Sequence, residues 1–203
     1  MKKWLLAITM VSVAWLTGCT VVPPAKIASE GVRSILVVPV VNETNSVGAD
    51  LLMVSRIAQP LSEKGYYVYP TDTVKMVLEA EGLYEPERVQ QLEPAKACEM
   101  FHSDAVLYIK VKYWDAQYAV FDTITKITVE YALYKADGQQ LFKNEFTHAR
   151  GNGASGGGLA GLVAQAVAAA ITRAAPDYRL VSTEANLLIL NNWEDGPYKA
   201  THK

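Results

Sequence analysis

The sequence predicts a mixed α/β fold of the α+β kind, with about five strands in one sheet and helices packed on it. The first part alternates aliphatic runs with amphipathic helical patterns, which is typical of parallel strand–helix–strand units. From residue 105 apolar residues recur at every second position, which indicates antiparallel strands. Half of the residues, 50%, are apolar, so the chain can bury the core of a single globular domain.

The first strand is expected at Ile35 to Val41, an almost wholly aliphatic run that fits a strand buried on both faces. Pro39 removes a ladder N–H within it, so we expect a bulge or a sheet edge there. A helix is expected from about Gly48 to Lys64, and Pro60 should kink or split it. Tyr66 to Tyr69 predicts a second, short strand.

Further helices are expected before residue 105. One starts at Thr71 or Asp72, which can cap it, and ends at Gly82. Residues 85–102 indicate one broken helix that restarts at a proline. Cys98 lies on its apolar side, so we expect a buried and unreactive thiol.

The middle of the chain predicts an antiparallel meander. Residues 105–113 and 127–133 alternate apolar and polar side chains, as a strand with one buried face does. Asp137 and Gly138 form a hairpin signal before a third strand at 141–148. A glycine-rich loop and an Ala-rich helix at 159–175 follow.

The chain begins with the pattern of a secretory leader. Two lysines precede an uncharged apolar run from Trp4 to Leu16, which is shorter than the ~20 residues of a spanning helix. The sequence Leu-Thr-Gly-Cys that ends at Cys19 resembles the lipobox of bacterial lipoproteins. The resemblance implies cleavage between Gly18 and Cys19 and lipid on Cys19. Thr20, in place of Asp, implies the outer membrane. The alternative is an ordinary leader with an incidental cysteine.

These features divide the chain into four expected parts. Residues 1–18 are the signal peptide, and residues 19–33 are a lipidated tether that contains two consecutive prolines. This tether would reach at most roughly 50 Å. Residues 34–190 form the domain, and residues 191–203 are expected to be a loose C-terminal tail.

Composition narrows the classes of function. The formal net charge is −2, so nothing favours nucleic acid, which needs a basic face. The three histidines are far apart, and no zinc-type, calcium-loop or phosphate-loop spacing occurs. We therefore expect no metal site and no cofactor.

The glycine-rich loop matches two catalytic or binding patterns. It contains G-x-G-x-x-G, but after an antiparallel strand, which is the wrong context for a dinucleotide. It also contains G-x-S-x-G around Ser155, whose only downstream histidine, His202, is next to last in the chain. A plainer interpretation is a flexible loop that contacts a partner. Its candidate contact residues are Gly151, Gly153, Gly156, Gly157 and Gly161.

Aromatic residues gather where two strands of the meander should turn. Tyr113 accompanies Trp114, Tyr118 and Phe121 in this stretch, and the last three are candidate partner contacts. If these side chains project, they form a contact patch. If they fold back, they belong to the edge of the core. The sequence leaves both alternatives open.

Five features together resemble a family of bacterial lipoproteins of unknown function. They are the lipobox, the Val-Val-Pro-Val-Val strand, the Tyr-Tyr-Val-Tyr-Pro strand, the Ala-Val-Leu-Tyr-Ile strand, and the glycine-rich loop before a small-residue helix. The resemblance covers most of the mature domain. It implies a fold like the N-terminal domain of TolB, also seen in the secretion lipoprotein CsgG and in LpoB. Family members tend to be encoded beside CsgG-like lipoproteins, and the family offers no catalytic residues to carry over.

We expect a non-enzymatic lipoprotein, anchored in the outer membrane and facing the periplasm. It would be an accessory or assembly subunit of a cell-envelope complex. Expected partners are the membrane, through acyl chains on Cys19, and CsgG-like or sibling lipoproteins, or further copies of the chain. One alternative is an LpoB-like regulator of cell-wall synthesis. Another is a small serine hydrolase that uses Ser155.

Overall fold

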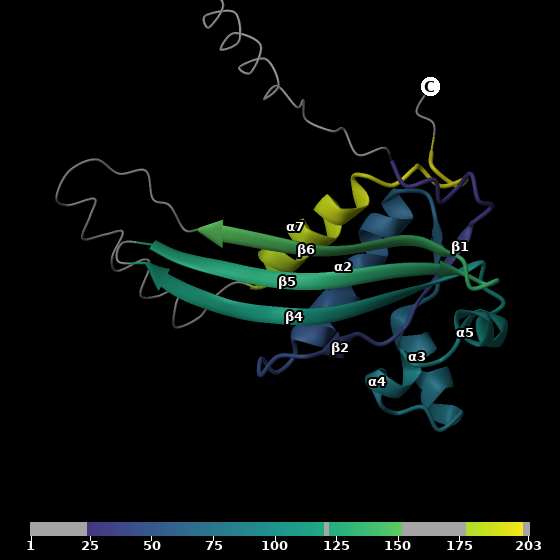
Figure 1. The fold of residues 1–203 in the computed structure, drawn as a ribbon, viewed down its shortest axis with the longest axis horizontal. Coiled ribbons are helices and arrows are strands. Elements are labelled where there is room, and N and C mark those ends of the chain that lie inside the picture. The colour runs from purple at the N-terminus through teal and green to yellow at the C-terminus, as the bar shows by residue number, and fades with distance from the viewer. Residues whose placement is uncertain (1–23, 120–121, 152–177, 201–203) are drawn as a thin grey trace, which may run out of the picture.

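The computed structural model describes residues 24–119, 122–151 and 178–200 (Figure 1). Its elements follow the predicted order up to residue 151, except that the first predicted strand is divided in two. They are β1 (Ser34–Val37), β2 (Val41–Asn42), α2 (Ala49–Glu63), β3 (Tyr67–Val68), α3 (Thr71–Ala80), α4 (Pro86–Val89), α5 (Pro94–Phe101), β4 (Ala105–Ala119), β5 (Asp122–Lys135), β6 (Gln140–Gly151) and α7 (Tyr178–Leu190). The predicted Ala-rich helix at 159–175 lies outside the described residues.

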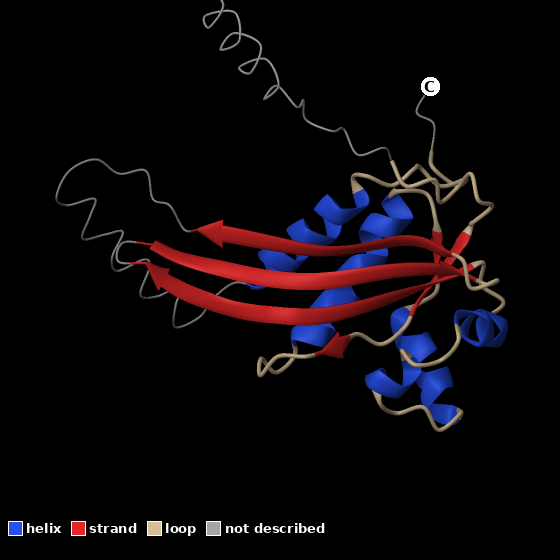
Figure 2. Cartoon of the chain, in the orientation of Figure 1, coloured by secondary structure: helices blue, strands red, loops and turns tan. Residues whose placement is uncertain are grey.

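One mixed sheet carries the whole arrangement (Figure 2). Its strand order is β3-β1-β4-β5-β6, and β2 also pairs with β4. β1 runs parallel to β3 and to β4, whereas β4, β5 and β6 are antiparallel. The predicted α+β fold class is thus confirmed, with a parallel half built by strand–helix–strand units and an antiparallel half built by hairpins.

Pro39 interrupts the first aliphatic run. β1 ends at Val37, opposite Leu107, and β2 resumes at Val41, opposite Lys110. Three residues between the two strands therefore face two residues of β4. This is the one-residue excess of a β-bulge, which is where the missing N–H of a proline costs no ladder hydrogen bond.

Pro60 does not divide its helix. α2 runs without interruption from Ala49 to Glu63, with Pro60 buried inside it. Of the two effects expected from Pro60, a kink or a split, the split does not occur. The proline lies in the last turn, where Lys64 N–H still donates to Pro60 O at 2.9 Å. A proline has no N–H, so the hydrogen bond that residue 60 would otherwise donate cannot form.

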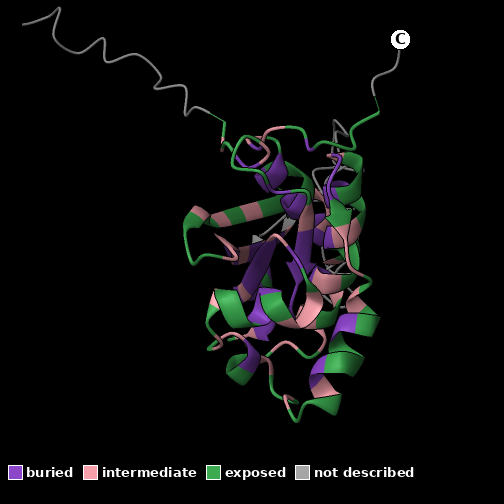
Figure 3. Cartoon of the chain, turned by 90° about the vertical axis from the view of Figure 1, so that its right-hand side faces the viewer, coloured by how far each residue is buried: buried purple, intermediate pink, exposed green. Residues whose placement is uncertain are grey.

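Helices cover both faces of the sheet and create two cores. On one face α2 and α7 pack together over β4, β5 and β6, around Met53, Ile57, Leu107 and Ile127. On the other face α3, α4 and α5 pack over the start of β4 in a smaller core. Figure 3 shows buried residues in purple on the strands and on the helices that cover them. Cys98 is buried in the smaller core, as predicted, and burial raises the pKa of its thiol.

Both ends of the described chain are packed, which corrects two expected boundaries. Ile27 is fully buried, although residues 19–33 were expected to be a tether. Trp193 is 2% exposed, although residues 191–203 were expected to be loose. Gly196 N–H donates to Lys64 O at 2.8 Å, and Tyr198 N–H donates to Gly65 O at 3.0 Å. The two segments cover the same end of the core, a contact between distant parts of the sequence that no local pattern encodes.

β4 and β5 form a long hairpin. Their paired register extends from Ala105 opposite Lys135 to Ala119 opposite Asp122. In Figure 1 the far end of this hairpin projects beyond α2 and α7, away from the purple start of the described chain. No described helix combines the length and the apolar character that crossing a bilayer requires.

Candidate interaction surfaces

The predicted anchor, Gly18 and Cys19, lies outside the described residues, but the chain just after it is fixed to the domain. Ala25 N–H donates to Asn192 O at 2.7 Å, and Glu194 N–H donates back to Ala25 O at 3.1 Å. These two bonds join Ala25 to the segment around Trp193 as an isolated parallel bridge. These residues therefore form the end of the molecule that is nearest to any lipid on Cys19. We call it the anchor end.

Side chains reinforce this anchor end. The carboxylate of Glu194 accepts hydrogen bonds from Ser29 N–H at 3.0 Å and from Ser29 Oγ at 2.9 Å. The bonds from Ser29 lower the pKa of Glu194. Tyr66 Oη donates to Glu194 O at 2.9 Å, and the Trp193 ring packs edge-on against Tyr66 and Phe142. Hydrogen bonds and ring contacts thus join three separate parts of the chain at the anchor end.

The aromatic candidates differ in what the structure describes. Trp114 is 5% exposed and stacks on Tyr178 of α7 with ring centroids 5.1 Å apart. Of the two alternatives left open by the sequence, the structure therefore shows that the Trp114 side chain folds back into the core. Nothing is described of the side chains of Tyr118 and Phe121, so their role as partner contacts stays a prediction.

The glycine candidates lie mostly outside the described residues. Gly151 ends β6, opposite Ile124 of β5, and is exposed. The other candidates, and the serine at the centre of the G-x-S-x-G match, fall in the part of the chain that is not described. They are Gly153, Gly156, Gly157, Gly161 and Ser155. Their proposed contact with a partner stays a prediction.

A charged cluster joins the end of β6 to α7. His148 Nε2 lies 2.8 Å from Glu184 Oε2, and Arg150 forms an ion pair with the same carboxylate. The Phe146 ring stacks on the His148 ring. Sequence reasoning did not find this cluster, although the alternation along β6 places all three side chains of that strand on one face. Among the described residues no group of three metal-ligand side chains occurs.

A second charge cluster lies on the face of the sheet opposite α2 and α7, which we call the outer face. Lys112 Nζ lies 2.9 Å from Glu130 Oε2 and 2.9 Å from Glu145 Oε2. Lys143 Nζ of β6 lies 3.6 Å from Glu130 Oε1. The hydrogen bond from Lys112 lowers the pKa of Glu130. The four side chains form a ladder of alternating charge across β4, β5 and β6.

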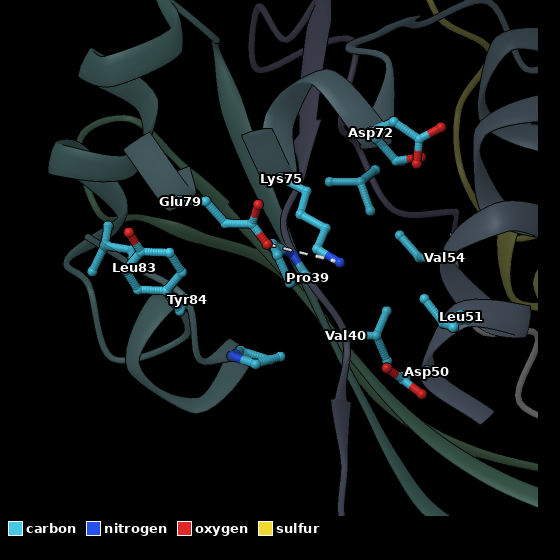
Figure 4. Close-up of a pocket in the computed structure, with 13 residues that line it drawn as sticks. Pro39, Val40, Asp50, Leu51, Val54, Asp72, Lys75, Glu79, Leu83 and Tyr84 are labelled. Carbon is cyan, nitrogen blue, oxygen red and sulfur yellow. Dashed lines mark ion pairs between the residues drawn. The ribbon is translucent and has the colours of Figure 1, made fainter. Parts of the chain in front are cut away.

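A cleft of about 260 Å³ opens beyond the carboxyl end of β1 (Figure 4). One wall comes from α2, through Leu51 and Val54, and the other from α3 and the loop after it, through Lys75 and Tyr84. The chain at Pro39 forms the floor. In open α/β sheets this is the usual position of a binding site. The sequence did not indicate the cleft, because its walls come from three separate segments.

The cleft combines an apolar interior with an acidic rim. Leu51 is 59% exposed and Tyr84 is 71% exposed. The rim carries Asp50 and Asp72. Lys75 Nζ lies 3.8 Å from Glu79 Oε1 and forms an ion pair with it. Three carboxylates and one ammonium group thus line the cleft. The arrangement suits an apolar segment that carries a basic residue, because such a segment would match both the leucine and the carboxylates.

Comparison with known proteins identifies the family. The model of the family described as "Putative lipoprotein GNA1162-like" matches residues 25–196. The chain belongs to the GNA1162-like lipoprotein family. A relative, "Putative lipoprotein NMB1124/NMB1162" from Neisseria meningitidis serogroup B, is 33% identical over 159 residues, which are 76% of this chain and 74% of that protein. The resemblance seen in the sequence is thereby confirmed.

A solved structure of the same family agrees with this assignment. The crystal structure of lipoprotein GNA1162 from Neisseria meningitidis has a TM-score of 0.56 and 33% identity, covering 68% of this chain and 97% of that one. A PelC dodecamer from Paraburkholderia phytofirmans has a TM-score of 0.49 and 15% identity, covering 89% of this chain and 96% of that one. The second similarity is too weak to support an argument about assembly.

The boundaries of the GNA1162-like family match the boundaries of the packed domain. The family model begins at Ala25, the residue that is bonded to Asn192, and it ends at Gly196, which is bonded to Lys64. The packed segments at both ends therefore lie within what the family shares. The names of these relatives describe lipoproteins and state no activity.

Proposed function

We propose that this GNA1162-like lipoprotein is a non-enzymatic accessory subunit of a cell-envelope complex, anchored to the outer membrane by lipid on Cys19 and facing the periplasm. Its partners are CsgG-like or sibling lipoproteins. The membership of a lipoprotein family supports the anchor. Thr20 after the cysteine supports the outer membrane, by the same lipobox resemblance.

The observation that carries this proposal is the short link between anchor and domain. Ala25 lies six positions after Cys19 and is already hydrogen-bonded to the domain. Six residues span at most roughly 20 Å when fully extended. The domain therefore stays at the membrane surface, where it can join other proteins of the same membrane.

The same link weighs against the LpoB-like alternative. A regulator of an enzyme in the opposite membrane has to reach across the periplasm. The tether expected from the sequence, residues 19–33, reached roughly 50 Å. Because residues 25–33 are packed against the domain, the reach is less than half of that. A subunit that works beside its own membrane fits this geometry better.

The cleft is the surface that we assign to the partner. Its walls come from α2 and α3, and in Figure 1 α3 lies at the lower edge of the molecule, away from the purple start of the described chain at the anchor end. An apolar segment with a basic residue, from a lipoprotein in the same complex, would place its apolar side chain against Leu51. Its cation would face the carboxylates of Asp50 and Asp72.

The test is cross-linking in cells with a matched pair of variants. Leu51→Glu places a charge in the cleft. Met76→Glu places the same charge on α3 at a residue that is 69% exposed and does not line the cleft. After mild cross-linking and detergent extraction, mass spectrometry should identify a partner lipoprotein with the wild type and with Met76→Glu. With Leu51→Glu it should be lost. Recovery of the wild type alone, at monomer mass, would overturn the proposal.

A further inference from the structure

Among the described residues β6 is the last strand of the sheet, and one of its edges pairs with no other strand. It is twelve residues long, contains no proline, and pairs only with β5 among the described residues. Most of its side chains are half-buried or exposed. A long edge without a proline or a covering element is a template for another strand.

An apolar stripe on α7 runs beside this edge. Leu180, Leu187 and Leu188 are 49%, 41% and 42% exposed. They lie three or four residues from Glu184, and therefore on the same face of the helix as Glu184. Glu184 contacts the β6 residue His148, so this face is turned toward the β6 side of the molecule. A partner that pairs with β6 would cover the leucines as well.

The sequence of β6 is complementary to itself in one antiparallel register. With Asn144 on a two-fold axis, Lys143 lies opposite Glu145 of a second copy, and this pair occurs twice. Phe142 then lies opposite Phe146, also twice, on the other face of the strand. Moving the axis by one residue would place Lys143 opposite Lys143, or Glu145 opposite Glu145, and like charges in that position are unfavourable.

We propose that two copies of this chain associate through β6, antiparallel about Asn144, to form one continuous sheet. The charge ladder on the outer face then crosses the interface. Within one copy it runs from Lys112 to Glu145 and from Glu130 to Lys143. In the dimer, Lys143 of each copy meets Glu145 of the other. On the opposite face the leucines of the two α7 helices cover each other.

Complementary charge reversal tests the register. Lys143→Glu makes two like-charge pairs in its own homodimer, and Glu145→Lys does the same. When the two variants are co-expressed with different tags, their heterodimer has two opposite-charge pairs again. Lipidated protein is extracted in mild detergent, and the co-precipitation of one tag with the other is measured. The dissociation constant of each homodimer should rise roughly tenfold or more, and the heterodimer should return to the wild-type level.

A cysteine on the proposed axis gives a second, independent readout. Asn144→Cys places two thiols opposite each other and should give a disulfide-linked dimer on a non-reducing gel under mild oxidation. Glu81→Cys, at an exposed residue after α3, is the matched control and should stay monomeric. Melting temperatures close to the wild type establish that each variant is folded.

Three results would overturn the proposal. One is a heterodimer no more abundant than either homodimer. Another is equal cross-linking of Asn144→Cys and Glu81→Cys. The third is wild-type protein that does not co-precipitate with itself at any concentration tested, which would mean that the edge is covered by a different protein or by residues 152–177 of the same chain.

Discussion

Tyr131 Oη donates a hydrogen bond of 2.8 Å to Asn186 Oδ1, and the two side chains are 1% and 0% exposed. Asn186 Nδ2 in turn donates to Met53 O at 3.3 Å. One buried amide thus joins β5, α7 and α2, which lie far apart in the sequence. Burial also raises the pKa of Tyr131. The phenol therefore stays neutral and able to donate over the whole physiological range.

Removing this amide should destabilise the domain. Asn186→Leu leaves the buried Tyr131 hydroxyl without its acceptor, which costs about 1–3 kcal/mol of unfolding free energy. Tyr131→Phe should cost less, because Asn186 can keep its bond to Met53 O. Urea unfolding followed by circular dichroism measures each free energy.

The double variant shows whether the two groups act as a pair. Tyr131→Phe with Asn186→Leu removes both the donor and the acceptor, so its destabilisation should be smaller than the sum of the two single effects. Strict additivity would mean that the 2.8 Å contact between Tyr131 and Asn186 contributes nothing.

Features that depend on neighbouring residues in the sequence, such as strands, turns and bulges, could be predicted from local patterns. The alternation from Ala105 and the Asp137–Gly138 turn gave the meander, since the period of a strand is written in its own residues. The bulge at Pro39 followed from one missing N–H. The same reasoning placed the thiol of Cys98 in a core.

Features that join distant segments could not be predicted in this way. Trp193 is a single aromatic residue in a polar stretch, and only Tyr66 and Phe142, both far away in sequence, explain its burial. The cleft needs the chain at Pro39, the face of α2 that carries Leu51, and the loop at Tyr84 to come together. Neither feature leaves a period or a motif in the sequence.

Asp104 should make stability depend on pH in the acid range. Burial acts to raise the pKa of its carboxyl, but the N–H groups of Arg33 and Ser34 and the Ser34 hydroxyl, which donate to the carboxylate, outweigh it. The folded-state pKa is therefore below the unfolded value of ~3.9. The stabilisation is present above the unfolded pKa and is lost as the pH falls through the folded pKa.

The variant Asp104→Asn checks the sign. At pH 7 it should lower the unfolding free energy by about 1–2 kcal/mol, allowing for a carboxylate that is partly solvated. The difference from the wild type should shrink as the pH falls below ~4. Urea unfolding at a series of pH values measures it. A difference that stays constant down to pH 2 would contradict the assignment.

Trp193 should hold the C-terminal segment on the domain. Trp193→Ala empties a site between Tyr66 and Phe142, and such a truncation typically costs 3–5 kcal/mol. Trp193→Phe should cost much less, because the indole Nε1 has no hydrogen-bond partner among the described residues. Tyr198→Ala, at a residue that is 63% exposed, is the control and should change stability by less than about 0.5 kcal/mol. A loss for Trp193→Ala that is as small as the loss expected for Tyr198→Ala would show that Trp193 does not hold the C-terminal segment.

The chain contains two cysteines, and this makes the anchor testable with a matched pair. Cys19→Ser removes the thiol to which lipid would be attached, so metabolic labelling with palmitate should be abolished and the leader retained. Cys98→Ser changes a thiol that is buried in the smaller core and should leave the label unchanged. Thr20→Asp should move the labelled protein from the outer-membrane to the inner-membrane fraction of a density gradient. Persistence of the label in Cys19→Ser would refute the anchor itself, whereas an unchanged gradient position of Thr20→Asp would refute only the sorting signal. The two outcomes matter differently, because the short link from Cys19 to Ala25 keeps the domain within roughly 20 Å of whichever membrane holds the lipid.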